Sequence, residues 1–237
     1  MSNEVNYHPS DELLTGFAEG TLSAGMSVVI SAHTEQCSAC GQRVRDFESE
    51  ASVQWLESSE TVANQNAKSV AEPDFSSMIA DITSHAQSQH VSENQGANTE
   101  IHMLDHSVRL PKVLAKIASE GLVWKKLAGG INQAAVMLDD KTQCEFIYMK
   151  PGSQVPVHKH QGTEVTLVLD GSFSDELGQY HPQDFLVRDN SHTHQPASEE
   201  GCLCFAVLDS PLAFTNGLAR LLNPILRYRF RRATSLG

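Results

Sequence analysis

The feature of this chain that most restricts its fold is a spaced group of glycine, histidine and glutamate residues in its second half. The group contains Pro151, Gly152, His158, His160, Glu164 and Gly171. In a strand, residues two apart point to the same side, so the two histidines can face one interior. The Gln-Gly-Thr turn after the second histidine brings the chain back antiparallel, so Glu164 can join them as a ligand of a divalent metal ion.

Short segments rich in branched and aromatic residues surround this group, and pairs such as Pro-Gly and Asp-Gly separate them. We expect strands over 134–138, 144–149, 164–169, 184–187 and 202–208. Evenly spaced strands without intervening helices are typical of a sandwich or barrel. Residues 106–237 are therefore predicted to form an all-β domain with a C-terminal tail.

The spacing PG(x)5HxH(x)3E(x)6G resembles the first motif of the cupins, which are jelly-roll barrels. The second cupin motif supplies one more histidine, and here residues 188–196 offer both His192 and His194, while the usual Gly-Asp before the strand reads Gln183-Asp184. We favour His194, because a histidine followed two residues later by proline recurs in cupins of this type. We expect zinc at this site, although three histidines and a glutamate also accept iron, manganese, nickel or copper.

A polar segment divides the chain before this domain. Residues 84–100 contain one valine, no aromatic residue and many Ser, Gln and Asn, a composition that cannot pack a core. Ahead of it the apolar residues recur with helical spacing, with Ser10 and Ser23 suited to cap helices and Gly20 suited to end one. The sequence therefore predicts a small all-α domain over residues 1–84 and a linker over 85–105.

The helical domain contains a second candidate metal site. His33, Cys37 and Cys40 read H-x3-C-x2-C, and they lie either on one face of a single helix or where two helices meet at a turn over 34–39. Both geometries suit a tetrahedral zinc ion, for which His8 is the best fourth donor. One alternative is a redox dithiol, but that motif normally follows a strand, whereas the surroundings here are helical. The other alternative is that the cysteines only pack the core.

Residues 5–57 resemble the zinc-binding anti-sigma factors, cytoplasmic proteins that sequester sigma factors of the extracytoplasmic-function class. The resemblance implies that His8, His33, Cys37 and Cys40 bind zinc, and in some members oxidation of the cysteine pair releases zinc and partner. With the cupin domain attached, the architecture resembles that of the ChrR-type anti-sigma factors. This implies a regulator in which the barrel is needed for release under singlet-oxygen or organic-hydroperoxide stress.

An amphipathic helix is predicted after the zinc-binding region. Phe75, Met78, Ile79 and Ile82 follow Glu-Pro-Asp at i, i+3, i+4 and i+7 spacing. Because polar segments flank this helix, it is suited to lie in the apolar groove of a partner. The alternative is that it packs back on its own bundle.

The charge of the chain is unevenly distributed. Residues 1–105 contain 16 acidic and 3 basic residues, a net charge of −13, whereas the remainder contains 13 and 14, a net charge of +1. Direct binding to nucleic acid is excluded on this balance, because it needs a surplus of basic residues. The acidic half is instead suited to the basic surface of a DNA-binding protein, which the resemblance identifies as the sigma factor.

Other features bear on location and on the alternative function. The sequence lacks a membrane-spanning run and a signal peptide, and five cysteines make a poor disulfide framework, so we expect a cytoplasmic protein. Cys202 and Cys204 look like core residues of a strand. We expect a non-enzymatic regulator; the alternative is a metal-dependent cupin dioxygenase with a zinc-bound accessory domain.

Overall fold

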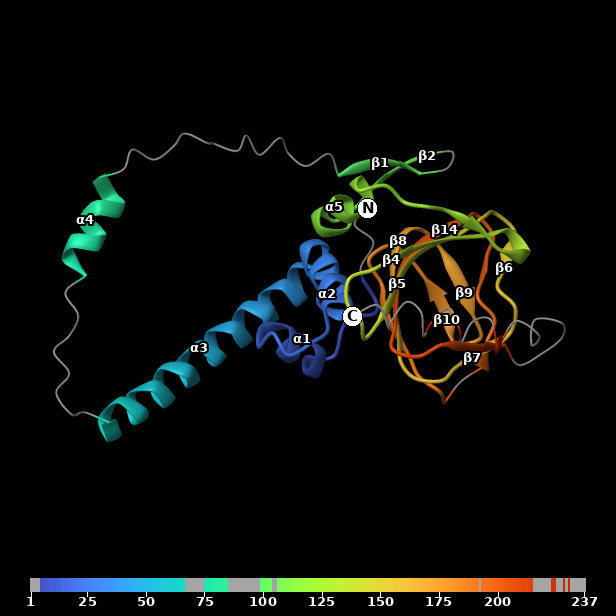
Figure 1. The fold of residues 1–237 in the computed structure, drawn as a ribbon. Coiled ribbons are helices and arrows are strands. Elements are labelled where there is room, and N and C mark those ends of the chain that lie inside the picture. The colour runs from blue at the N-terminus through green and yellow to red at the C-terminus, as the bar shows by residue number, and fades with distance from the viewer. Residues whose placement is uncertain are drawn as a thin grey trace.

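The computed structural model describes residues 5–66, 75–84, 99–103, 106–191, 193–214, 223–224, 228 and 230. Helices lie ahead of residue 85 and a β-rich barrel follows, as Figure 1 shows, which confirms the predicted fold class. Part of the predicted linker is a strand, because Glu100–Met103 pairs antiparallel with His106–Arg109. Apart from Thr99, the remaining predicted linker residues lie outside the described residues, as does most of the C-terminal tail.

Five α-helices lie within the described residues. They are α1 (Asp11–Ala18), α2 (Ala24–Gln36), α3 (Ser38–Asn66), α4 (Ser76–Ser84) and α5 (Lys112–Ser119). The hydroxyl oxygens of Ser10 and Ser23 accept hydrogen bonds from backbone N–H groups in the first turns of α1 and α2, as N-caps do. Among the described helices, none is both long enough and apolar enough to cross a membrane.

The break between α2 and α3 decides between the two geometries that the sequence left open for the zinc motif. Cys37 alone separates the helices, with extended backbone angles of φ −104° and ψ 103°. The motif therefore lies where two helices meet, across a break shorter than the turn that the sequence suggested. Figure 1 shows α3 extending from this point away from the rest of the molecule.

The strands are short except in the largest sheet. They are β1 (Glu100–Met103), β2 (His106–Arg109), β3 (Lys125–Lys126), β4 (Ile131–Val136), β5 (Gln143–Met149), β6 (Ser153–Gln154), β7 (His158–His160), β8 (Glu164–Gly171), β9 (Phe173–Asp175), β10 (Gly178–Tyr180), β11 (Phe185–Arg188), β12 (Thr193–His194), β13 (Ala197–Ser198), β14 (Cys202–Leu208) and β15 (Leu212–Phe214). A 3-10 turn over Ala128–Gly130 precedes β4.

Three sheets enclose the barrel. The largest has the order β11-β8-β14-β5-β4-β3, and the smaller ones have the orders β10-β9-β13-β6 and β12-β7-β15. The predicted strands at 144–149, 164–169 and 202–208 fall within β5, β8 and β14. β4 begins earlier than predicted because Asn132 and Gln133, whose polarity suggests a loop, are buried in the sheet.

The helices and the barrel share one core, which the sequence did not predict. β14 is buried along its whole length. On one face its Phe205 belongs to the same apolar cluster as Leu14 of α1 and Ile30 of α2. On the other face Cys202 and Cys204 belong to the cluster that fills the barrel. Because apolar burial is the main favourable term in folding, the helical region and the barrel stabilise each other.

We predict that Gly25→Ala destabilises the protein. Gly25 lies where α2 meets the sheet, and a Cβ atom added there would lie 2.6 Å from Sγ of Cys144 and 3.1 Å from Cγ1 of Val207. Overpacking of this kind costs about 1–3 kcal/mol of unfolding free energy, which chemical denaturation would measure. Ala24→Ser, at the exposed neighbouring position, is the control. Equal stability of the two variants would contradict tight packing of α2 on the sheet.

Candidate metal centres

The four side chains predicted to hold zinc come together in the structure. The ligand atoms of His8, His33, Cys37 and Cys40 all lie within 4.8 Å of one another. His8 precedes α1, His33 lies in the last turn of α2, Cys37 lies in the break and Cys40 lies in the first turn of α3. Three segments of chain therefore converge on one point.

The hydrogen bonds of the two histidines leave one nitrogen of each ring for a metal. Nε2 of His8 lies 3.1 Å from the carbonyl oxygen of Val5, and its Nδ1 lies 3.3 Å from Sγ of Cys40 and 3.5 Å from Sγ of Cys37. A carbonyl oxygen can only accept, so Nε2 carries the proton and the Nδ1 lone pair faces the thiols. The Nδ1 atom of His8 is therefore the nitrogen of this ring that is available to a metal ion.

His33 is wholly buried and shows the same arrangement with its nitrogens exchanged. Its Nδ1 donates to the carbonyl oxygen of Gln183 at 3.0 Å, and its Nε2 has no hydrogen-bond partner among the described residues. Burial lowers the pKa of His33 to about 4, so the ring is neutral at pH 7. A buried nitrogen left without a partner is costly, and a metal ion would satisfy it.

The Cys40 thiol is protonated when no metal is present. Burial, together with the neighbouring Cys37, raises the pKa of Cys40 to about 12. A metal bound here must therefore displace a proton from the thiol. Two imidazoles and two thiolates converging on one point fit zinc, which takes four nitrogen and sulfur ligands in a tetrahedron.

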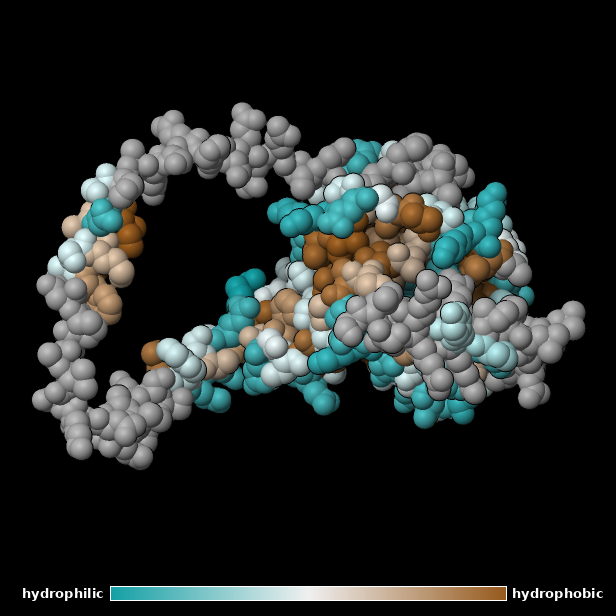
Figure 2. Space-filling model, viewed as in Figure 1, coloured by the Kyte–Doolittle hydropathy of each residue, from teal (hydrophilic) through white to brown (hydrophobic). Residues whose placement is uncertain are grey.

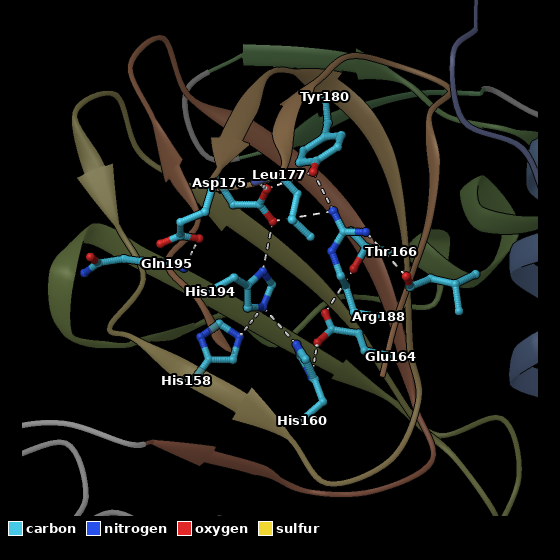
Figure 3. A network of polar contacts seen from close by, with 12 residues as sticks. His158, His160, Glu164, Thr166, Asp175, Leu177, Tyr180, Arg188, His194 and Gln195 are labelled. Atoms are coloured by element: carbon cyan, nitrogen blue, oxygen red, sulfur yellow. Dashed lines mark hydrogen bonds and ion pairs between the residues drawn. The ribbon is translucent and has the colours of Figure 1, made fainter. Parts of the chain in front are cut away.

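A second group lies inside the barrel, where His158 and His160 of β7 meet His194 of β12 (Figure 3). The antiparallel register of the two strands sets His194 directly opposite His158. Nε2 of His194 lies 3.0 Å from Nε2 of His158 and 2.9 Å from Nε2 of His160. All three side chains are buried.

The outer nitrogens of these rings determine what the inner ones can do. Nδ1 of His158 donates to the carbonyl oxygen of Pro156 at 2.9 Å, and Nδ1 of His194 lies 3.0 Å from a carboxylate oxygen of Asp175. Nε2 of His158 then carries a lone pair that faces Nε2 of His194, and a cation between the rings would suit this arrangement. Burial lowers the pKa of His158 to about 4, which also keeps this ring neutral.

Glu164 lies beside this group, with Oε2 at 2.9 Å from Nδ1 of His160 and Oε1 accepting the hydroxyl of Thr166 at 3.0 Å. Burial alone would raise the pKa of Glu164, but the contact with His160 and the nearby histidines lower it to about 2. The carboxylate is therefore ionised and in place to balance a cation. His192, the alternative to His194, lies outside the described residues.

Sequence reasoning missed the residues that orient His194. The Asp175 carboxylate lies 3.0 Å from Nδ1 of His194. It also accepts a hydrogen bond from the hydroxyl of Tyr180 at 2.8 Å and lies 3.5 Å from the Arg188 guanidinium (Figure 3). Burial would raise the pKa of Asp175, but these hydrogen bonds and the nearby arginine lower it. An acidic residue within a short strand is the only sequence signal that could have pointed to Asp175.

The other residues singled out from the sequence lie apart from both centres. Phe75, which immediately precedes α4, is exposed, as are Met78, Ile79 and Ile82 of α4, and the structure brings none of them to a core. Cys202 and Cys204 are buried in the barrel cluster with their sulfur atoms 3.5 Å apart, as packing residues would be. All five cysteines are free thiols.

Comparison with known proteins relates both halves of the chain to one relative. Residues 114–210 match the ChrR cupin-like domain. The chain is 29% identical over 225 residues to the anti-sigma-E factor ChrR of Cereibacter sphaeroides, covering 94% of this chain and 99% of that protein. It is thus similar to ChrR over nearly its whole length.

A solved structure of ChrR agrees with this relationship. The chain resembles the crystal structure of Rhodobacter sphaeroides SigE in complex with the anti-sigma ChrR, with a TM-score of 0.64, 26% identity and coverage of 87% of this chain and 100% of that chain. An RmlC-like cupin protein from Ralstonia eutropha matches with a TM-score of 0.39 and 17% identity, over 42% of this chain and 71% of that chain.

Zinc binding at the His8, His33, Cys37 and Cys40 centre is predicted to release protons. Because the pKa of Cys40 is about 12 without metal, the apparent affinity should rise about tenfold per pH unit for each proton displaced. Titration calorimetry in two buffers of equal pH and different ionisation enthalpy would count the protons. Cys40→Ala should release fewer protons, whereas His158→Ala should leave the count at this centre unchanged. An affinity independent of pH would contradict the prediction.

Proposed function

We infer that this chain is a ChrR-type anti-sigma factor, in which the helical region binds and inhibits a sigma factor of the extracytoplasmic-function class. The observation that carries this inference is the likeness to ChrR, which spans the helices and the barrel in the same order. Because that relative was solved in complex with SigE, a sigma factor is the partner we propose for this chain.

The exposed apolar side chains of α4 support a protein partner. Phe75, Met78, Ile79 and Ile82 are between 52% and 64% exposed, and Figure 2 shows apolar surface along α4, which stands apart from the rest of the described chain. Contiguous apolar surface of this kind is typical of an interaction site, and the i, i+3, i+4, i+7 spacing suits an apolar groove.

Long-range electrostatics favour the same kind of partner. The net charge of −13 over residues 1–105 would draw the helical half toward a basic protein surface and away from nucleic acid. A DNA-binding sigma factor offers such a surface. Inhibition would then result from covering the surfaces with which the sigma factor binds its other partners. Because a sigma factor acts in the cytoplasm, we propose that this chain does too.

We propose that zinc occupies the first centre, with His8, His33, Cys37 and Cys40 as its ligands. When bound, zinc would cross-link three segments of chain at the base of α3, and so fix the direction of that helix. We propose that a divalent metal ion occupies the barrel centre, with His158, His160, His194 and Glu164 as ligands. Zinc is the ion that we propose for this centre.

We further propose that oxidative stress, by singlet oxygen or organic hydroperoxides, releases the sigma factor and that the barrel is needed for this response. The likeness to ChrR supports a regulatory role over an enzymatic one. A cupin dioxygenase remains the alternative for the barrel. Its signature would be metal-dependent consumption of O2 with a diketone substrate, abolished by His158→Ala.

The sigma-factor hypothesis predicts that Met78→Glu with Ile82→Glu weakens binding by more than about tenfold, because two apolar anchors of the α4 stripe would become charged. The measurement is co-purification and calorimetry of the full chain with the extracytoplasmic-function sigma factors of the same genome. Ser77→Glu with Ser84→Glu adds equal charge to the opposite face of α4 and should bind normally. If the unaltered chain binds none of these sigma factors, the proposed function is wrong.

A further inference from the structure

The turn and strand from His181 to Arg188 in the barrel contact the N-terminal metal centre. Asp184 is buried, and its Oδ1 accepts the backbone N–H groups of Asn6 at 2.9 Å and Tyr7 at 3.2 Å. The carbonyl oxygen of Tyr7 in turn accepts the N–H of Phe185 at 2.9 Å. These three hydrogen bonds hold the backbone immediately before His8 against the start of β11, which is an edge strand of the large sheet.

The same few residues orient the other histidine of this centre. The carbonyl oxygen of Gln183 accepts Nδ1–H of His33 at 3.0 Å, and the rings of His33 and Phe185 meet edge to face with centroids 5.5 Å apart. The metal-binding nitrogens of His8 and His33 thus owe their orientation to residues 183–185 of the barrel.

The residue just before this segment, Tyr180, and its last residue, Arg188, also support the barrel centre. Tyr180, which immediately precedes the segment, donates its hydroxyl to Oδ1 of Asp175, and the Arg188 guanidinium contacts both Tyr180 and Oδ2 of Asp175. Asp175 is the carboxylate that receives Nδ1 of His194. The ring of Tyr7 packs edge to face on that of Tyr180, with centroids 5.2 Å apart. One short stretch of chain therefore lies between the ligands of both centres.

One residue of this stretch has a strained backbone conformation. Gln183 has φ +80°, and it is the only residue other than glycine among the described residues with a positive φ. Such a conformation costs about 1–3 kcal/mol and persists only where the surroundings enforce it. The N–H of Gln183 and the carbonyl oxygen of Asp184 bond to Val168 of β8, which anchors the turn to the sheet. A turn held in this way can transmit a shift at one end to the other.

We propose that residues 180–188 couple the two metal centres, with Asp184 and Gln183 as positioning residues that the barrel supplies to the N-terminal centre. Occupancy of the barrel centre fixes His194 and, through Asp175, Tyr180 and Arg188, the turn that carries Asp184. The affinity of the N-terminal centre for zinc therefore depends on the barrel centre, and the dependence is reciprocal. This inference rests on the proposed occupancy of both centres by metal.

The experiment measures zinc affinity at the N-terminal centre in the full chain. Cobalt(II) bound there gives a thiolate charge-transfer absorption that a centre of histidine and glutamate ligands lacks, so displacement of cobalt by zinc reports this centre alone. Loss of a group that orients a metal ligand typically costs 10- to 100-fold in affinity. We expect a loss of this size for Asp184→Asn, and at least about fivefold for His194→Ala.

A matched control separates this coupling from other effects. Asp189→Asn makes the same chemical change in the exposed loop that follows β11 and should leave the affinity unchanged. If Asp184→Asn does not fold, the result for His194→Ala decides.

The outcomes distinguish the coupling from the proposed function. A cobalt–thiolate band in the unaltered chain, with zinc affinity unchanged within about twofold in folded Asp184→Asn and His194→Ala proteins, overturns the coupling alone. Absence of the band in the unaltered chain overturns both the zinc assignment and the coupling. A selective loss of affinity in these two variants, with Asp189→Asn unaffected, supports the proposal.

Discussion

The packing of α1 and α2 on the large sheet is the constraint on which the rest of the structure depends. β14 is buried on both faces, so its side chains belong alternately to the helix-facing core and to the barrel interior. Neither half can lose the other without exposing a face of this sheet to water, at a cost of about 25 cal/mol for each Å² of apolar surface. The same packing buries His33 against the barrel, so the N-terminal centre is formed partly by the second half of the chain.

The shared core bears on how the helical region and the barrel could act together. A helical inhibitor tethered by a linker to an independent sensor would need a signal to travel along a polar segment. Here the helical region and the barrel share an apolar core and hydrogen bonds, such as those that the Asp184 carboxylate accepts from the backbone of Asn6 and Tyr7. A change in the barrel can therefore act on the helices through direct contact.

Much of the architecture could be predicted because its signals are local. The helical and β-rich regions follow from periodicity, and the ligand groups follow from short spacings such as H-x3-C-x2-C and HxH, which place side chains together once the local structure forms. The contacts that orient those ligands could not be predicted. Gln183 lies 150 residues from His33, and Asp175 of β9 contacts His194 of β12 although their strands belong to different sheets. Gln183 itself stands where cupins usually have glycine, and its positive φ explains that preference.

The length of α3 has a mechanical consequence. The helix contains 29 residues, and at 1.5 Å per residue it reaches about 40 Å beyond the turn that carries Cys40. Figure 1 shows most of that length standing clear of the barrel. A tilt of about 10° at the first turn would displace the far end by roughly 7 Å, more than the spacing of one helical turn. Because His8, His33, Cys37 and Cys40 converge at the base of α3, a small shift among these residues would be amplified at the far end of the helix.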